Sequence, residues 1–467
     1  MKILFILPYV PYPLDSGGNQ AVFTMLDYLK DRHEISLLLS THGENAAKNV
    51  EKLKEALGNV FIFHHKKAAK AMLPEEDFGY MPPLPQKVCR IALSVANSMQ
   101  RKINRRRRKY KVVQQQDGVG SDFIRFNSTL FARNEYLTSD YCQYVRDVAN
   151  QGFDIVQVEF YELLPLVYVL PRDVRKIFVH HELRFVRNAN EMALFKESHI
   201  KDPIRYAEEK ACELAALSLY DDVITLSEID KNLLLEELPS LSIHVSPAAL
   251  FMAQEKVAFK IQPARSFVFV GSGNHLPNAD GLLWFCQEIL PIFRTYEQEQ
   301  VKVYVVGNWS ETLRRVVTTN NPEIEFTGFV DDLQAFLNGK ISIVPIRIGS
   351  GIRIKILEAV VSKSPFISTA KGCEGLPALH GQNCLVADTP QDFAQAMQLL
   401  LHDSGSQQKL ALCASETINS LQGRDKILEL RNNIYLKKID KYQVNFSKLC
   451  NINIFFLKIT QSYVNFY

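Results

Sequence analysis

A glycine turn followed by ionisable side chains is the stretch of this sequence best suited to chemistry. The apolar run from Ile341 to Pro345 predicts a buried parallel strand, and a helix is predicted to begin just after the turn Gly349-Ser350-Gly351. Glycines allow backbone N–H groups to approach an anion, and the N-terminus of a helix adds partial positive charge. The pattern therefore predicts a phosphate-binding loop.

Three ionisable residues follow this turn: Arg353, Lys355 and Glu358. A guanidinium can donate to two phosphate oxygens at once, and an ammonium adds a point charge. The carboxylate of Glu358 lies further along the predicted helix, where it can accept hydrogen bonds from sugar hydroxyls. The alternative is a surface loop with ordinary helix charges, because short patterns of glycine and basic residues are common.

At these residues the sequence resembles the C-terminal domain of retaining glycosyltransferases of family 4, which have the GT-B fold. The family has two glutamates separated by seven residues; Glu358 matches the second, and Ser350 stands where the first would be. The resemblance implies that Glu358 contacts the ribose, while the family's contact to the transferred sugar has no match at Ser350. A subgroup with the pattern Gly-x-Gly-x-Arg-x-Lys-x-Leu-Glu is closer and is matched by Gly349, Gly351, Arg353, Lys355, Leu357 and Glu358.

The N-terminal residues 2–30 predict a strand, a loop rich in proline and glycine, and an amphipathic helix. This loop lacks the G-x-G-x-x-G of a dinucleotide fold, and the later turn at Gly271 lacks its third glycine, so NAD binding is not favoured. Gly17 and Gly18 resemble the first loop of family 4 N-terminal domains, which lets substrate come close to the backbone. The alternative is a turn that needs a positive φ and nothing more.

The segment Arg175 to His180 predicts a strand of the N-terminal sheet, and the carboxyl end of such a strand points into the ligand crevice of an open α/β sheet. In the resembling family, a histidine followed by an acidic residue stands there and contacts the sugar or the acceptor. His181 and Glu182 match, with His180 as the other candidate, although a histidine at a strand end is often structural. The predicted catalytic residues are His181, Arg353 and Lys355.

Members of family 4 hold the diphosphate with an arginine and a lysine just after the first strand of the C-terminal domain, and neither follows Val270 in this sequence. The resemblance then assigns the phosphate charge to the basic pair of the glycine loop, aided by Asn274 and His275. It places the base against the backbone of residues 328–330. The predicted donor-binding residues are Gly17, Gly18, Gly271, Asn274, Gly328, Val330, Ser350, Gly351, Arg353, Lys355 and Glu358.

Length and composition fit two domains of a globular protein. The chain has 467 residues, 47% of them hydrophobic and 22% charged, with a net charge of +3 that demands no polyanionic partner. The eight cysteines are scattered without zinc-type spacing, which is typical of reduced residues in a cytosolic protein. No window of about 20 apolar residues predicts a membrane span.

The segment from Arg101 to Lys111 carries eight basic residues among eleven. Such a run is commonly a solvated helix end or loop. The functional alternative is contact with anionic lipid headgroups, since a basic segment near an apolar helix gains about 1 kcal/mol per charge at such a surface. Nucleic acid is not favoured, because Tyr110 is the run's single aromatic residue and stacking surfaces need more.

The sequence therefore predicts an α/β protein of the GT-B fold, with two Rossmann-like, doubly wound domains facing across a cleft. We assign residues 1–245 to an acceptor-side domain with a basic insert at about 66–150, 246–262 to a linker, 263–436 to a donor-binding domain, and 437–467 to a tail without an assigned role. The predicted function is retaining transfer from a nucleotide-sugar donor to a glycan or lipid-linked acceptor without a metal or other cofactor. The alternatives are a nucleotide-sugar epimerase and a nucleotide-binding scaffold with a decayed site. The expected location is the cytoplasm or the inner face of the membrane.

Overall fold

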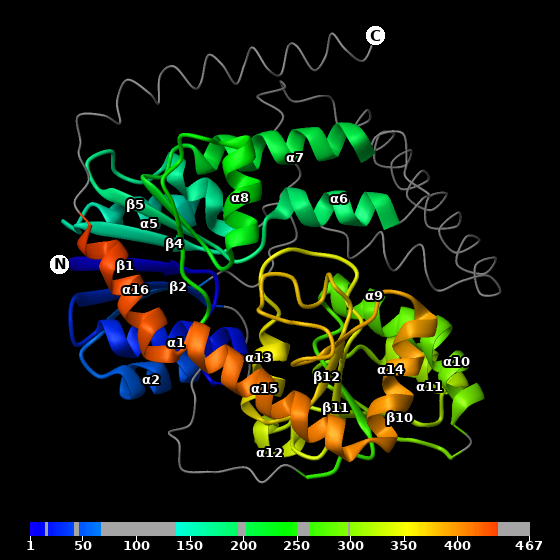
Figure 1. Cartoon of the computed structure of the whole chain (residues 1–467). Coiled ribbons are helices and arrows are strands. Elements are labelled where there is room, and N and C mark those ends of the chain that lie inside the picture. Colours follow the sequence, from blue (N-terminus) through cyan, green and yellow to red (C-terminus); the bar gives the residue numbers. More distant parts are fainter. Residues whose placement is uncertain are drawn as a thin grey trace, which may run out of the picture. The chain divides into compact units, whose positions relative to one another are not determined.

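A computed structural model describes residues 1–14, 17–41, 46–66, 137–194, 202–249, 262–297 and 299–437. The basic run, most of the predicted linker and nearly all of the predicted tail lie outside these ranges. In Figure 1 the described elements are coloured along the chain, and both sheets are flanked by helices.

The N-terminal domain is built from alternating strands and helices. Its strands are β1 (Lys2–Leu7), β2 (Glu34–Thr41), β3 (Phe61–Lys66), β4 (Ile155–Glu159), β5 (Arg175–His180), β6 (Asp222–Thr225) and β7 (Ile243–Val245). Its helices are α1 (Gly17–Leu29), α2 (Ala46–Leu57), α5 (Ser139–Ala149), the 3₁₀ segment η2 (Tyr161–Tyr168), α6 (Arg184–Leu194), α7 (Asp202–Leu217) and α8 (Glu228–Glu237).

The second sheet has the same alternation. Its strands are β8 (Phe267–Val270), β9 (Val303–Val306), β10 (Ile324–Gly328), β11 (Ile341–Val344), β12 (Phe366–Ser368) and β13 (Leu385–Val386). The helices after Val270 are α9 (Leu276–Trp284), the π-turn η3 (Phe285–Ile289), α10 (Leu290–Tyr296), α11 (Glu311–Asn320), α12 (Leu333–Leu337), α13 (Ile354–Val361), α14 (Pro390–His402), α15 (Ser404–Gln422) and α16 (Arg424–Leu436).

The strand orders are those of doubly wound sheets. The first sheet runs β3-β2-β1-β4-β5-β6-β7 and the second runs β10-β9-β8-β11-β12-β13, with parallel pairing along the second sheet and from β2 to β7 in the first. The order reverses between β1 and β4 in the first sheet and between β8 and β11 in the second. Ligands of open α/β sheets bind at the carboxyl ends of the strands at such points. The predicted fold class, two Rossmann-like parallel-sheet domains, is confirmed.

Strand β1 shows why these apolar runs form central strands. Ile3, Phe5 and Leu7 pack into one core cluster, and Leu4 and Ile6 pack into the cluster on the other face. Side chains alternate between the two faces of a strand, so a strand covered on both faces must be apolar at every position. The carboxyl end of β1 is thereby held in the interior of the sheet.

The last helix does not pack with the sheet that precedes it in the chain. Ile427, Leu428 and Tyr435 of α16 belong to the core cluster of β1 and α1. In addition, the Nη1 and Nη2 atoms of Arg175 on β5 donate to the carbonyl oxygens of Tyr435 and Ile434 at 2.9 and 3.0 Å. The sequence-based division assigned α16 to the C-terminal domain, whereas the structure packs it on the N-terminal sheet. Strand β7, with its three residues, was not identified from the sequence.

Candidate functional site

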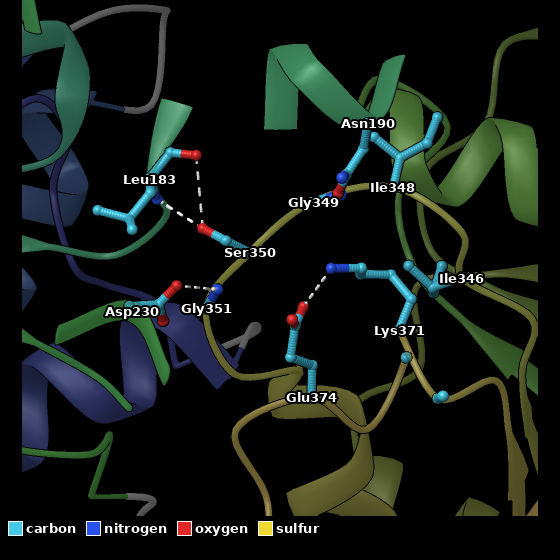
Figure 2. A network of polar contacts seen from close by, with 12 residues as sticks. Leu183, Asn190, Asp230, Ile346, Ile348, Gly349, Ser350, Gly351, Lys371 and Glu374 are labelled. Carbon is cyan, nitrogen blue, oxygen red and sulfur yellow. Dashed lines mark hydrogen bonds and ion pairs between the residues drawn. The ribbon is translucent and has the colours of Figure 1, made fainter. Parts of the chain in front are cut away.

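The predicted phosphate loop, between β11 and α13, is bound to the N-terminal domain by its backbone and by Ser350. Figure 2 shows three contacts in a row: Gly349 N donates to Asn190 Oδ1 at 3.3 Å, Ser350 Oγ accepts from Leu183 N at 2.6 Å, and Gly351 N donates to Asp230 Oδ1 at 3.3 Å. Ser350 is 3% exposed. Ser350, at the place of the family's first glutamate, therefore holds the loop against Leu183, the residue that follows His181 and Glu182.

Both glycines of the turn are required by geometry. Gly349 and Gly351 have φ values of 116° and 74°, in the left-handed region that other residues rarely adopt. A Cβ at position 351 would also lie 2.3 Å from the carbonyl oxygen of His181. The glycine pattern recognised in the sequence thus permits a close approach between the loop and the end of β5.

Arg353 uses much of its hydrogen-bonding capacity on the loop itself. Its Nη1 donates to the carbonyl oxygens of Ser350 and Gly351, the latter at 2.7 Å. Arg353 is also the N-cap residue of α13, and its side chain makes no capping bond, so the first N–H groups of that helix are not capped by it. Its Nη2 donates to the carbonyl oxygen of Ile348 at 3.4 Å. The guanidinium therefore orders the turn, and Nε and the second N–H of Nη2 remain for an anion.

Lys355 joins the segment after the glycine turn to the loop that follows β8. Its Nζ donates to Asn278 Oδ1 at 2.7 Å, and the amide of Asn278 donates to Ser272 O at 3.0 Å. A Cβ at Gly271 would lie 2.7 Å from the Asn278 side chain, so this close packing also needs a glycine. Burial, with the charge of Arg353, lowers the pKa of Lys355 to about 7. An anion arriving beside this ammonium would favour its charged form.

Glu358 is a buried carboxylate without a hydrogen-bond partner among the described residues. It is 9% exposed, and burial raises its pKa to about 7 against the opposing attraction of Lys355. The N-terminus of α1 lies against it: a Cβ at Gly17 would lie 3.0 Å from Glu358 Oε1 and 2.0 Å from Ile354 Cγ2. The close approach expected at Gly17 is therefore made by helix α13. Buried carboxylates are costly when unpaired, which makes Glu358 a candidate ligand group.

A charged cluster lies between the loop and α6. Arg187 donates from Nη1 to Glu182 Oε2 and from Nε to Glu191 Oε1, both at 3.0 Å. His275 is exposed, and the nearby charge of Arg187 lowers the pKa of its imidazole, which accepts from Arg187 Nη1 at 3.3 Å. Burial acts to raise the pKa of Glu182, but the charge of Arg187 and of other nearby basic residues outweighs it and lowers that pKa to about 2. Arg187 is thus neutralised within the protein, and His275 adds no charge for a diphosphate.

His181 lies where the sequence predicted it, one residue beyond β5. Its Nε2 bonds to Glu159 Oε2 at 2.9 Å, and its ring is stacked on Phe160. His180, the other candidate, is 2% exposed and pairs with the buried Glu213 in the core. Glu159 was not identified from the sequence. Its position as a carboxylate at the end of an apolar strand could have indicated it, because strand ends face the ligand site in such sheets.

The remaining predicted donor-binding residues lie on several loops. Gly18 is the second residue of α1, and Asn274 is an exposed residue whose N–H donates to Ser272 Oγ at 3.4 Å. Gly328 has a φ of 73°, and its carbonyl accepts from Gly307 N at 2.8 Å. The side chain of Val330 packs against the small cluster of Val268 and its neighbours, so only its backbone could face a base.

Within the described ranges, no group of three or more His, Cys, Asp or Glu side chains is arranged to hold a metal ion. The described helices include none with the length and apolar composition needed to cross a membrane.

Residues 264–403 match the family described as glycosyl transferases group 1. The matched stretch contains the glycine turn 349–351 and the loop that begins at Gly271. A Klebsiella pneumoniae protein described as an uncharacterized 44.6 kDa protein in the cps region is 22% identical over 407 residues, covering 84% of this chain and 89% of that protein.

Solved GT-B structures resemble nearly the whole chain. A mutant of TarM from S. aureus, in complex with fondaparinux, α-GlcNAc-glycerol and UDP, has a TM-score of 0.60 at 11% identity, covering 93% of this chain and 100% of TarM. HepE from Anabaena, in complex with UDP and glucose, has a TM-score of 0.57 at 13% identity, with 93% and 99% covered. Sucrose-phosphate synthase from Thermosynechococcus elongatus has a TM-score of 0.59 at 13% identity, with 93% and 98% covered. The chain has the GT-B fold.

Proposed function

We propose that this protein transfers a sugar from a nucleotide-sugar donor to a glycan or lipid-linked acceptor with retention of the anomeric configuration. One arrangement carries the proposal: six consecutive residues bring together the N-terminus of α13, the basic pair Arg353 and Lys355, and Glu358. In the part of the chain that the structure describes, the carboxylate of Glu358 has no hydrogen-bond partner. A nucleoside diphosphate fits this arrangement, because its phosphates can bind the basic pair and the helix N-terminus while its ribose hydroxyls donate to Glu358. The group 1 domain over residues 264–403 supports it.

The chemistry assigned to these residues is charge stabilisation. As the bond between the anomeric carbon and the diphosphate oxygen breaks, the electron pair goes to the leaving diphosphate. Arg353, Lys355 and the N–H groups at the start of α13 would stabilise that charge. The acceptor hydroxyl then bonds the anomeric carbon on the face from which the diphosphate left, and its proton passes to the departing diphosphate oxygen. No metal is needed in this proposal, so turnover should be unchanged by EDTA.

The remaining parts of the proposal concern substrates. HepE and TarM were crystallised with UDP, which makes UDP-sugars the first donors to test. The TarM complex with fondaparinux and α-GlcNAc-glycerol supports a glycan acceptor. We further propose that the basic run at residues 101–111 contacts an anionic membrane, where a lipid-linked acceptor would be available.

A donor screen by thermal shift tests the proposal. UDP- and GDP-sugars are added to the full chain, and a donor present at about 100 times its dissociation constant should add about 2.7 kcal/mol of stability. A stabilising donor is then incubated alone with the protein. An isomer of the donor would indicate an epimerase, and binding without turnover in the presence of acceptors would indicate a scaffold. Stabilisation by no nucleotide sugar would overturn the proposal.

A further inference from the structure

The imidazole of His181 is held in one orientation by two contacts. Nε2 bonds to Glu159 Oε2 at 2.9 Å, and the ring lies parallel to Phe160, with centroids 4.0 Å apart and planes at 3°. The carbonyl of the same residue lies against Gly351, where a Cβ would approach it to 2.3 Å. The side chain is 25% exposed, so the ring is fixed without being sealed from solvent.

Glu159 is in turn held by a buried chain of hydrogen bonds. Gln157 Nε2 donates to Glu159 Oε1 at 2.7 Å, and Gln157 Oε1 accepts from the hydroxyl of Tyr435 at 2.6 Å. Burial acts to raise the pKa of Glu159, but the hydrogen bond and charge of His181, with Arg431 and Gln157, outweigh it and lower that pKa. Glu159 is thus ionised, and Tyr435 of α16 supports it from behind.

Phe160, whose ring stacks on the imidazole, has an unfavourable backbone conformation. Its φ is 71°, a value that residues other than glycine seldom adopt. The edge of Tyr9, from the loop after β1, packs against its ring at 5.2 Å. Strained residues of this kind persist where neighbours hold them, and they concentrate at functional sites. Tyr9 and Phe160 follow β1 and β4, so the strain lies at the point where the order of the first sheet reverses.

The contacts also select one form of the imidazole. An ionised carboxylate can only accept, so the hydrogen of the bond to Glu159 belongs to Nε2. The Nδ1 atom has no hydrogen-bond partner among the described residues. Nδ1, which is an acceptor in this tautomer, is therefore the ring nitrogen available to a ligand hydroxyl.

We propose that Glu159 is a positioning residue that keeps His181 in the Nε2–H form and turns Nδ1 towards a hydroxyl of the transferred sugar. The inference rests on the proposed function for the identity of the ligand, and it extends that function to a residue of β4. Gln157 and Tyr435 complete the support. The carboxylate acts through His181 and does not itself touch the substrate.

Nitrogen NMR of the full chain labelled with ¹⁵N-histidine tests the positioning without any substrate. At about pH 9, where an imidazole is ordinarily neutral, the signals lost in His181→Asn are assigned to His181. They should show the Nε2–H form in the wild type and a mixture of both forms in Glu159→Gln. His244, whose Nε2 pairs with Asp222 at 2.9 Å, is the internal control and should be unchanged. A single Nε2–H form in Glu159→Gln would overturn the inference.

Turnover tests the link to the donor. Glu159→Gln should lower kcat about tenfold or more while UDP affinity stays within about twofold, because a misoriented group costs rate rather than phosphate contacts. Tyr435→Phe should give a smaller loss in the same direction. Tyr220→Phe is the matched control, since it also deletes a buried tyrosine hydroxyl, bonded to Leu164 O at 2.9 Å, and it should keep kcat. If Tyr220→Phe and Tyr435→Phe lower kcat equally, Tyr435 has a structural role only. This result would contradict the role of the hydrogen bonds from Tyr435 through Gln157 to Glu159.

The two tests separate the inference from the function on which it rests. If no nucleotide sugar is consumed by the wild type, the proposed function fails, while the NMR result still decides how His181 is held. If the wild type is active and Glu159→Gln is equally active, the function stands and the positioning role is refuted.

Discussion

Replacing Glu358 with glutamine should stabilise the free protein and weaken nucleotide binding. Burial raises the pKa of this carboxyl from 4.5 to about 7, and that value already reflects the opposing attraction of Lys355. The folded state therefore binds the proton more tightly than the unfolded chain does. Stability is lost as the pH rises from about 4.5 through 7, and glutamine, which carries no charge, avoids this loss.

The magnitude follows from the two pKa values. At about 1.36 kcal/mol for each pH unit, the difference between 4.5 and about 7 corresponds to about 3 kcal/mol above pH 7. For a domain of about 200 residues, this should raise the melting temperature of Glu358→Gln by about 5–10 °C at about pH 8.5, and by little at about pH 5. Loss of charged hydrogen bonds to ligand hydroxyls, at about 1.5–3 kcal/mol, should weaken UDP or GDP binding about tenfold or more.

The same substitution at Glu323 is the matched control. Glu323 is 5% exposed, but its Oε1 accepts from Arg294 Nε at 2.7 Å, so Glu323→Gln breaks an ion pair and should lower the melting temperature. Thermal unfolding at both pH values and calorimetric titration of the nucleotide are the assays. A Glu358→Gln protein that is destabilised at about pH 8.5 and binds the nucleotide normally would refute the ligand role and leave Glu358 as a structural residue.

Three further predictions concern charge. Arg353→Ala should weaken binding of a nucleoside diphosphate about tenfold or more, as measured by calorimetry. Arg347→Ala, which removes a partner of Asp280 instead, should not weaken it. Equal affinities of the two variants would contradict diphosphate binding by Arg353. Because the pKa of Lys355 is lowered to about 7, diphosphate binding at about pH 8.5 should take up close to one proton, measured in buffers of different ionisation enthalpy, and Lys355→Gln should abolish the uptake. Changing the four arginines at 105–108 to serine should abolish salt-sensitive co-sedimentation with anionic vesicles; equal sedimentation with neutral vesicles would contradict membrane contact.

The fold was predictable because its central strands are short apolar runs, and such runs indicate strands buried on both faces of a parallel sheet. The run ending at Leu7 is covered on both faces of the sheet, and the run from Ile341 to Val344 is buried at all four positions. The packing of α16 was not predictable from local pattern, because it depends on contacts such as that between Tyr435 and Gln157, 278 residues apart. Periodicity identifies a helix and gives no information on which sheet the helix packs against.

The candidate site was predictable where a motif is local. The glycine turn lies where its pattern indicates, and on α13 Glu358 is buried and Lys355 half-buried. The sequence could not show which hydrogen-bond donors and acceptors pair with one another within the protein. Arg353 gives both Nη1 bonds to carbonyls of its own loop, and Ser350 bonds to Leu183, 167 residues away. The pairing of Glu159 with His181 joins the ends of two neighbouring parallel strands and depends on their register.

Sugar transfer itself is the most direct test of the account. The full chain is incubated with the donor that stabilises it and with candidate glycan and lipid-linked acceptors, and proton NMR follows the nucleoside diphosphate released and the anomeric configuration of the new linkage. The account predicts equal amounts of diphosphate and glycosylated acceptor, with the configuration of the donor kept, and loss of both in Arg353→Ala. Consumption of no nucleotide sugar, or a product of inverted configuration, would contradict it.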